Sequence, residues 1–145
     1  MCGIVGAHGI TTTASFDLSV LDHRGPDHAN IIQVQDMILG HTRLSIIDVE
    51  SGAQPLISSD GRYQLVCNGE VYNHQELRQA FPDYNFQTSS DNEVILALYA
   101  KYGTQAITYL NGMFAFVLYD TETAQIYMGR DALGIKPLYY GWDGD

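Results

Sequence analysis

The sequence predicts an α+β protein with antiparallel sheets. Short apolar and β-branched segments recur along the chain, while only a few segments have helical periodicity. Strand-like and helix-like segments do not alternate regularly, so the repeated strand–helix–strand units of a parallel sheet are not expected. With 145 residues, of which 46% are apolar and 17% charged, the chain has the composition of one globular domain with a substantial core.

The first third of the chain predicts strands and one short helix. Residues 3–7 are small and apolar, which is typical of a buried strand. A helical pattern over residues 15–21 ends before the chain-breaking pair Gly25-Pro26. Three further segments have strand composition, with a tight turn expected between the first two: 31–34, 37–39 and 44–49.

Asn68-Gly69 is the strongest hairpin signal in the chain. Strand-like residues 63–67 precede the pair and residues 70–72 follow it. Asn-Gly between two such segments favours a type I′ turn, because both central residues of that turn need a positive φ. A helix is predicted over residues 74–81 and ends at Pro82.

The clearest helical pattern covers residues 91–102. Its apolar side chains fall on one stripe, and Gly103 follows as a C-terminal cap. Ser90 and Glu93 have the spacing of a capping box at the N-terminal end. The remaining predicted elements are a short helix over 106–110 and strands over 112–119, 125–129 and 138–141.

The charge balance excludes several classes of partner. Lysine and arginine together number 7 and aspartate and glutamate 17, which gives a net charge of −10. Such a chain repels phosphate backbones and anionic lipid, so no nucleic-acid or membrane partner is expected. The sequence contains no run of about 18 apolar residues, and its first residues do not resemble a secretory signal. We therefore expect a cytoplasmic protein whose two cysteines, Cys2 and Cys67, are reduced.

The pattern of metal-binding and phosphate-binding residues predicts no cofactor. None of the five histidines pairs with another at the i, i+4 spacing of a helical metal motif. No glycine-rich loop opens a helix in the way that a phosphate-binding loop does.

Cys2 is the most informative single position. If Met1 is removed, one residue carries both a thiol and a free α-amine. An α-amine has a pKa of about 7.7–8.0, far closer to neutrality than the value of about 10.4 for a lysine, so it can act as a general base. A nucleophile activated by its own α-amine is a known catalytic arrangement. The alternative is that Cys2 is an incidental small residue of a buried strand.

Other residues also allow a functional and a structural interpretation. Besides forming a turn, Asn68 and Gly69 could direct an amide N–H and a backbone N–H at a developing oxyanion. Arg43 is suited either to bidentate capture of a carboxylate or to a surface ion pair. Asp91 could cap a helix or bind a substrate ammonium group. For Glu70, too, both a structural role and a substrate-binding role are possible. Cys67, inside an apolar strand, is expected to be an inert core thiol.

Seven sequence blocks, taken in order, resemble a known family. They are Met1-Cys2-Gly3-Ile4-Val5-Gly6, His23-Arg24-Gly25-Pro26-Asp27, His41-Thr42-Arg43-Leu44-Ser45-Ile46-Ile47-Asp48, Gln54-Pro55-Leu56, Asn68-Gly69-Glu70-Val71-Tyr72-Asn73-His74, Ser90-Asp91-Asn92-Glu93 and Arg130-Asp131-Ala132-Leu133-Gly134-Ile135-Lys136-Pro137-Leu138-Tyr139-Tyr140-Gly141. Together they resemble the N-terminal glutaminase domain of glutamine-hydrolysing asparagine synthetases, which are class II glutamine amidotransferases. The resemblance covers nearly the whole chain, 1–145.

The resemblance implies a fold and a reaction. The fold is that of N-terminal-nucleophile hydrolases, a four-layer αββα sandwich of two antiparallel sheets. The reaction is hydrolysis of the glutamine side-chain amide to glutamate and ammonia through a thioester on Cys2, with ammonia passed to a synthetase domain or subunit. Asn68 and Gly69 are then the oxyanion hole. The residues implied for glutamine binding are Arg43, Leu44, Ser45, Ile46, Ile47, Asn68, Gly69, Glu70 and Asp91.

The chain also departs from the family pattern. The segment between Cys2 and His23 is shorter than is usual for the family, and the sequence given stops at Asp145 without a synthetase half. ATP and Mg²⁺ belong to that half, so no cofactor is expected here. A fragment, a natural short form and a designed reduction remain open, as do a non-catalytic glutamine-binding module, an inactive folded fragment and assembly into a homo-oligomer.

Overall fold

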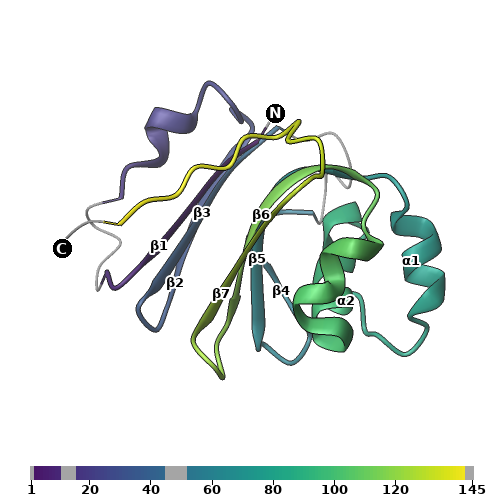
Figure 1. The fold of residues 1–145 in the computed structure, drawn as a ribbon. Coiled ribbons are helices and arrows are strands. Elements are labelled where there is room, and N and C mark those ends of the chain that lie inside the picture. The colour runs from purple at the N-terminus through teal and green to yellow at the C-terminus, as the bar shows by residue number, and fades with distance from the viewer. Residues whose placement is uncertain (1, 11–15, 45–51, 143–145) are drawn as a thin grey trace.

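The computed structural model describes residues 2–10, 16–44 and 52–142, which form two packed antiparallel sheets. The first sheet contains β1 (Gly3–His8), β2 (His28–Val34) and β3 (Met37–Arg43) in the order β1-β3-β2. The second contains β4 (Leu56–Ile57), β5 (Tyr63–Val71), β6 (Gly112–Asp120) and β7 (Gln125–Arg130) in the order β4-β5-β6-β7. The predicted α+β sandwich of antiparallel sheets is therefore confirmed (Figure 1).

Helical elements cover the outer faces of the two sheets unequally. The helices α1 (His74–Ala80) and α2 (Val94–Tyr102) lie on the side of the second sheet that faces away from the first (Figure 1). The 3₁₀ turns η3 (Asp91–Glu93) and η4 (Gly103–Tyr109) flank α2. The outer face of the first sheet carries only the short turn η2 (Leu18–Leu21) among the residues that the structure describes. The fourth layer implied by the resemblance is thus reduced to one 3₁₀ turn in the described ranges.

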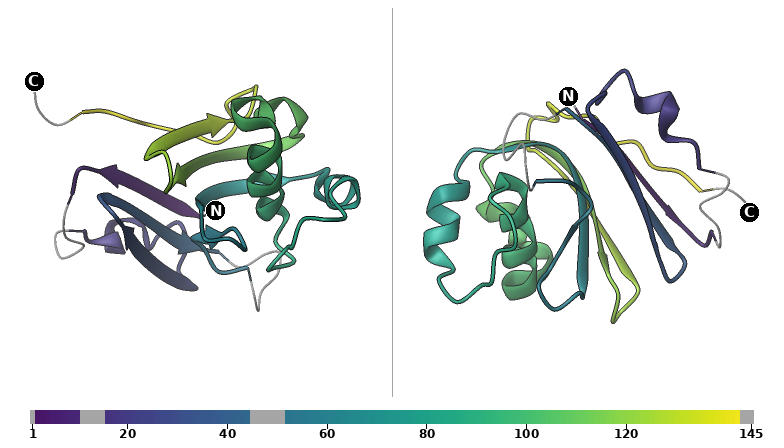
Figure 2. Two further views of the ribbon diagram at one scale, coloured as in Figure 1. Left: turned by 90° about the horizontal axis from the view of Figure 1, so that it is seen from below. Right: turned by 180° about the vertical axis from the view of Figure 1, so that it is seen from behind.

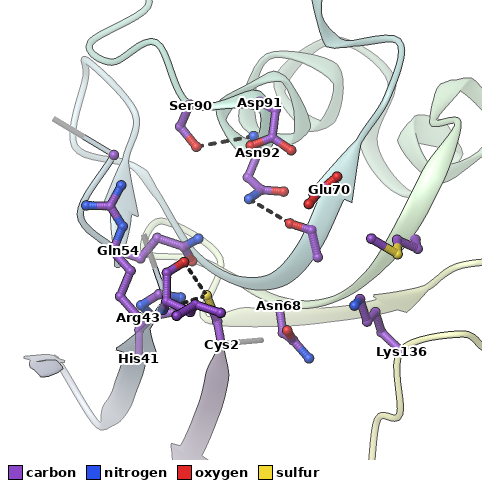
Figure 3. Close-up of a pocket in the computed structure, with 14 residues that line it drawn as sticks. Cys2, His41, Arg43, Gln54, Asn68, Glu70, Ser90, Asp91, Asn92 and Lys136 are labelled. Atoms are coloured by element: carbon purple, nitrogen blue, oxygen red, sulfur yellow. Dashed lines mark hydrogen bonds between the residues drawn. The ribbon is translucent and has the colours of Figure 1, made fainter. Parts of the chain in front are cut away.

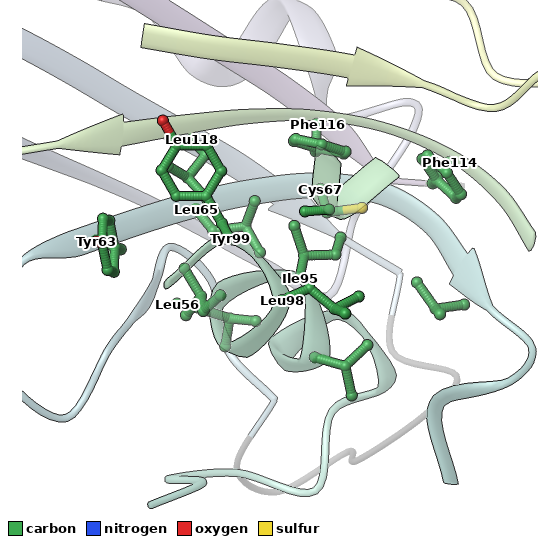
Figure 4. Packing of buried hydrophobic residues seen from close by; sticks show 14 of the residues in the cluster. Leu56, Tyr63, Leu65, Cys67, Ile95, Leu98, Tyr99, Phe114, Phe116 and Leu118 are labelled. Carbon is green, nitrogen blue, oxygen red and sulfur yellow. The ribbon is translucent and has the colours of Figure 1, made fainter. Parts of the chain in front are cut away.

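Side-chain alternation along β5 separates two apolar cores. Leu65 and Cys67 point toward α2 and belong to the larger core, together with Leu98 and Phe116 (Figure 4). Val66 points the other way and belongs to the core between the sheets. Neighbouring residues of a strand face opposite sides of the sheet, so this one strand supplies both layers.

The core between the sheets fills one end of the space that separates them. It contains residues of both sheets: Met37, Leu39, Val66, Val117 and Tyr119, with Ile4, Ile32 and Val34 at its margin. The same faces of β1, β3 and β5 continue beyond this core as polar side chains, which include His41 and Asn68. The sandwich therefore has an apolar end and a polar end.

The predicted hairpin at Asn68-Gly69 is wrong. Both residues lie inside the continuous strand β5, where Asn68 pairs with Ala115 and Gly69 with Phe114 of β6. Gly69 has a φ of +145°, and a Cβ at this position would collide with the Met113 carbonyl oxygen. The glycine is needed because the two strands approach closely there, and not because the chain turns.

Other boundaries also differ from the sequence prediction. Residues 138–141 form no strand; they run away from the second sheet with Tyr139 and Tyr140 exposed (Figure 2). β3 ends at Arg43, so Leu44 is not in a strand, and the rest of the strand predicted over 44–49 lies outside the described residues. Of the helix predicted over 15–21, only the turn η2 is present in the described part.

The capping box before α2 is only half correct. Ser90 Oγ accepts a hydrogen bond from the N–H of Asn92 at 3.3 Å, as an N-cap should. The Glu93 carboxylate does not reach back to Ser90; it accepts from the N–H groups of Gln87 at 2.6 Å and Thr88 at 2.8 Å. It fixes the preceding loop instead. The predicted helix over 91–102 consequently begins as the 3₁₀ turn η3 and becomes α-helical at Val94.

The Arg62–Asp120 ion pair joins the residue just before β5 to the last residue of β6. We expect it to make the stability of the fold depend on pH. Arg62 Nη2 lies 2.7 Å from Asp120 Oδ2 and Nε lies 2.9 Å from Oδ1. Chiefly because of these bonds, the pKa of Asp120 is lowered to about 2. A lowered pKa in the folded state contributes stability above the unfolded value of about 3.9, and that contribution is lost as the pH falls toward 2.

We expect Asp120→Asn to lower the free energy of unfolding by about 1–3 kcal/mol at pH 7. Urea denaturation at pH 7, 4 and 2.5 measures this, and the difference from the unsubstituted chain should shrink as the pH falls. Glu122→Gln is the control, because Glu122 pairs with the same arginine from an exposed position and should cost less than about 0.5 kcal/mol. A difference for Asp120→Asn that does not change with pH would contradict the assignment.

Candidate active site

A pocket lies at the polar end of the sandwich, where the starts and ends of several strands meet. The start of β1, the end of β3, the last residues of β5, the turn η3 and the loop after β7 contribute its walls (Figure 3). Its lining consists of Cys2, His41, Arg43, Leu44, Gly52, Gln54, Asn68, Gly69, Glu70, Ser90, Asp91, Asn92, Met113 and Lys136. Segments that are distant in the sequence therefore bring a thiol, cations, carboxylates and amides into one cavity.

Cys2 lies at the start of β1, one residue before the first pair with β3. Its side chain is half-buried in the pocket wall, where the N–H of Leu44 is directed at Sγ at 3.5 Å. The sulfur also lies 3.8 Å from the Leu44 carbonyl oxygen. The thiol therefore faces the pocket from a fixed position on the first sheet.

The His-Arg-Gly-Pro-Asp block anchors this end of the first sheet. Arg24 Nε donates a hydrogen bond to the Cys2 carbonyl oxygen at 3.2 Å, and the N–H of Asp27 donates to the Arg43 carbonyl oxygen at 3.0 Å. Gly25 between them packs so closely on β3 that a Cβ would collide with the backbone of Thr42. The block thus fixes the two strand ends that carry Cys2 and Arg43. Sequence reasoning assigned no role to Arg24.

Arg43 and His41 occupy alternate positions of β3 and both line the pocket. Arg43 is only 7% exposed. Burial and the neighbouring Arg43 lower the pKa of His41 to about 4, so this histidine is neutral at neutral pH. Arg43 is then the charged group of this wall.

Asn68, Gly69 and Glu70 contribute the wall that belongs to the second sheet. Asn68 is 4% exposed and its side chain lies on the same face of β5 as Val66, toward the first sheet. It lines the same pocket as Cys2 (Figure 3). The carbonyl oxygen of Gly69 accepts a hydrogen bond from Asn92 Nδ2 at 3.4 Å. Because the strand is held from both edges, Asn68 and Gly69 have a fixed orientation in the pocket that the thiol also lines.

Asp91 and Glu70 place two carboxyl groups on the side of the pocket that faces Arg43 (Figure 3). Asp91 is 3% exposed, and its Oδ2 accepts the N–H of Val71 at 2.7 Å. Burial raises the pKa of Asp91, because the charged carboxylate loses its hydration. A cationic ligand group beside it would compensate for that loss. Arg43 therefore lies across the pocket from these two carboxyl groups, and Lys136 is a second cation in the lining, on the side of Asn68.

Gln54 and Lys136 are among the pocket residues that sequence reasoning missed. Gln54 is 4% exposed and bonds to the backbone of Cys67. Lys136 is buried in the wall near Asn68 (Figure 3), and the loop that carries it is shaped by Asp131, which accepts the N–H of Ile135 at 2.8 Å and of Lys136 at 3.0 Å. Both residues belong to sequence blocks that carry the family resemblance, which was the available signal.

Most of the expected site residues are brought together. Among the described ones, the pocket contains Cys2, Arg43, Leu44, Asn68, Gly69, Glu70 and Asp91. Ser45, Ile46 and Ile47 lie outside the described residues. Cys67 lies on the other face of β5, where burial raises the pKa of its thiol well above the ordinary value. It faces the core next to α2 and not the pocket.

Within residues 2–10, 16–44 and 52–142, no group of three or more histidine, cysteine, aspartate or glutamate side chains is placed to hold a metal ion. In the same ranges no helix has the length and apolar character to cross a membrane.

Comparison with known proteins agrees with this geometry. Residues 1–145 match the family described as glutamine amidotransferase domain. Asparagine synthetase B [glutamine-hydrolyzing] of Escherichia coli (strain K12) is 50% identical over 151 residues, which cover 99% of this chain and 27% of the relative. Asparagine synthetase [glutamine-hydrolyzing] of Asparagus officinalis is 45% identical over 152 residues, covering 100% of this chain and 26% of the relative. The chain thus spans about a quarter of the length of these relatives.

A solved structure supports the same fold. The glutamine phosphoribosylpyrophosphate amidotransferase from B. subtilis, in a complex with ADP and GMP, superposes with a TM-score of 0.50 at 26% sequence identity. The match covers 59% of this chain and 21% of that one. Fold and site together define an amidotransferase of the N-terminal-nucleophile type.

Within that class, the chain belongs to the glutamine amidotransferase domain family and is homologous to the N-terminal glutaminase domain of asparagine synthetases.

Proposed function

We propose that this chain hydrolyses the side-chain amide of L-glutamine to glutamate and ammonia, with Cys2 as the nucleophile. The observation that carries the proposal is the charge pattern around the thiol. Arg43 lies on one side of the pocket, and Asp91 and Glu70 lie on the other. A free amino acid carries a carboxylate and an ammonium group, so this pocket can hold its α-carbon end and leave the side chain facing Cys2.

Each step of the proposed reaction has a group to perform it. Once Met1 has been removed, the Cys2 α-amine accepts the thiol proton and the sulfur attacks the carboxamide carbon of glutamine. The Asn68 side-chain N–H and the Gly69 backbone N–H donate to the oxyanion that forms. Ammonia leaves with the proton that the amine returns to it. Water then attacks the γ-glutamyl thioester and releases glutamate and the Cys2 thiol.

The partners follow from the products. Ammonia is the useful product of an amidotransferase domain, and the curated relatives are asparagine synthetases, so we propose a synthetase domain or subunit as the acceptor. The proposed hydrolysis requires a thiol, an amine and hydrogen-bond donors, all of which belong to the chain, and therefore no cofactor. Both cysteines are free thiols, which supports a reducing cytoplasmic location.

The direct test is an assay of the 145-residue chain for release of glutamate and ammonia from glutamine. Intact mass is measured first, because only a chain that has lost Met1 carries the free amine. We expect equal amounts of the two products from glutamine and about 10–200-fold slower release from asparagine, which is one methylene shorter. A chain of the correct mass that binds glutamine without releasing ammonia would contradict the proposed function.

Substitution of Arg43 is expected to weaken the binding of glutamine. A guanidinium group that holds the α-carboxylate interacts about equally with the ground state and the transition state, so Arg43→Ala should raise KM about 10–100-fold and change kcat little. Arg43→Lys should not restore KM, because an ammonium group cannot form the bidentate pair. Steady-state kinetics measure both effects.

The matched control is Arg130→Ala. Arg130 is exposed and bonds to the carbonyl oxygen of Gly134, outside the pocket. Its removal should leave KM unchanged. A normal KM in a folded Arg43→Ala variant would show that another group holds the carboxylate.

A further inference from the structure

One edge of β5 has no paired strand next to the pocket, because β4 pairs with β5 only farther from it. β4 pairs with β5 only through Leu56 with Leu65 and Ile57 with Gln64, whereas β6 pairs with β5 along its full length on the other edge. In the register that β4 sets, Gln54 is the residue that comes opposite Cys67. The described residues 52–55 form no strand there, so the backbone groups of Cys67 on this edge need another partner.

The side chain of Gln54 supplies that partner. Its Oε1 accepts the N–H of Cys67 at 2.6 Å, and its Nε2 donates to the carbonyl oxygen of Cys67 at 3.1 Å. A primary carboxamide has the same donor and acceptor as a peptide group, so the side chain reproduces the pair of bonds that an adjacent strand would make. The Gln54 carbonyl oxygen accepts from Asn30 Nδ2 of β2 at 3.3 Å. Gln54 therefore connects the two sheets beside the pocket.

Side chains replace the missing strand at the next two positions as well. Asn92 Nδ2 donates to the Gly69 carbonyl oxygen at 3.4 Å, and Asp91 Oδ2 accepts the N–H of Val71 at 2.7 Å. Gln54 makes two such bonds, and both are to Cys67, the residue directly before Asn68. The Cys67 carbonyl and the Asn68 N–H belong to the same planar peptide group. A fixed Cys67 carbonyl consequently fixes the plane from which Asn68 extends.

We propose that Gln54 is a positioning residue of glutamine hydrolysis, which holds β5 at Cys67 and thereby orients Asn68 and Gly69 toward Cys2. This inference rests on the proposed function. Gln54 lines the pocket, and both polar atoms of its carboxamide bond to the backbone of Cys67, so the role assigned to it is exerted through the strand. Oxyanion donors must be in place before the reaction, and a small displacement of them lowers the rate of the chemical step.

The test compares Gln54→Met with Gln64→Met in the glutamine hydrolysis assay of the 145-residue chain. Methionine keeps the length and volume of the side chain but removes the carboxamide. Gln64 is the matched control: it is buried, it lies on β5, and its Oε1 has no hydrogen-bond partner among the described residues. We expect Gln54→Met to lower kcat about 10–100-fold with KM within threefold of the unsubstituted value, and Gln64→Met to change neither.

Two measurements keep the inference testable if Gln54→Met does not fold. Gln54→Asn retains a polar amide but is one methylene too short to make both bonds, and it should lower kcat about tenfold at unchanged KM. Amide hydrogen exchange of the unsubstituted chain, followed by NMR, should show the Cys67 N–H as protected as that of Leu65, although no strand lies beside it.

The outcomes separate the two proposals. No ammonia release by the unsubstituted chain would overturn the proposed function and this inference with it. Turnover by the unsubstituted chain, with an unchanged kcat in folded Gln54→Met or Gln54→Asn, would overturn the inference alone. Rapid exchange of the Cys67 amide would do the same. A kcat loss that Gln64→Met shares would show a general effect of the substitution and would also overturn the positioning role.

Discussion

Replacement of Cys2 by alanine is expected to abolish glutamine hydrolysis and to leave the fold intact. The thiol is the only nucleophile in the proposed reaction, and removal of such a group typically lowers kcat by several orders of magnitude. Cys2 is half-buried and precedes the first pair of β1 with β3, so its truncation removes little packing. Ammonia release measures the activity, and calorimetric titration with glutamine measures the remaining affinity, which should persist because Arg43 and Asp91 are unchanged.

Cys67→Ala is the matched control for the nucleophile. Its thiol is fully buried against the core next to α2, on the face of β5 opposite the pocket, and only the backbone of Cys67 bonds to Gln54. The substitution should lower the free energy of unfolding by about 1–2 kcal/mol through the cavity it leaves, with kcat retained. Unchanged turnover in Cys2→Ala, or its loss in a folded Cys67→Ala variant alone, would exclude the Cys2 mechanism.

The second large effect is expected at Asn68. If its side-chain amide donates to the oxyanion, Asn68→Ala should lower kcat about 10²–10³-fold with little change in KM, because the bond forms chiefly in the transition state. Asn68→Asp keeps the size of the side chain but places a carboxylate next to the developing negative charge. It should be at least as damaging. Stopped-time assays at saturating glutamine give kcat, and circular dichroism confirms the fold of each variant.

In the structure, a substitution at Asn68 does not disturb a turn, so a loss of kcat can be attributed to the side-chain amide. Asn68 lies in the middle of β5 with ordinary strand pairing to Ala115, so no turn depends on its side chain. Val66→Ala is a useful comparison, since Val66 lies on the same face of β5 in the apolar core between the sheets. It should reduce stability and not kcat. Full activity in folded Asn68→Ala would leave Gly69 N–H as the only proposed donor.

Sequence periodicity was sufficient to predict most of the fold. The hairpin of β2 and β3, the helices α1 and α2 and the strands β6 and β7 lie where apolar patterns and breakers placed them. The pair Asn68-Gly69 was misinterpreted because glycine serves both a positive-φ turn and a close approach of two backbones. Only the position of Met113 on β6 distinguishes these uses, and that position is a long-range property.

The site was predictable to the extent that the family resemblance carries it. Periodicity alone left Cys2, Arg43 and Asp91 with structural alternatives, and the structure brings all three into one pocket. Gln54 and Arg24 were missed for a physical reason. Each acts on the backbone of a residue far away in the sequence, and the need for Gln54 arises only because β4 begins no earlier than Leu56.

The alternation along β5 has a practical consequence for anyone who varies this chain. Substitutions at Leu65 and Cys67 should change the melting temperature at nearly constant turnover. Those at Asn68 and Glu70 should change turnover at nearly constant melting temperature. A screen that measures both quantities can therefore vary these neighbouring positions almost independently. Insertion or deletion of one codon within the strand removes that independence. It exchanges the two faces at once, sends the amide of Asn68 into the hydrocarbon packed on α2 and exposes that packing to the pocket. Length variation in this strand should therefore be absent from any active library, however permissive its point substitutions are.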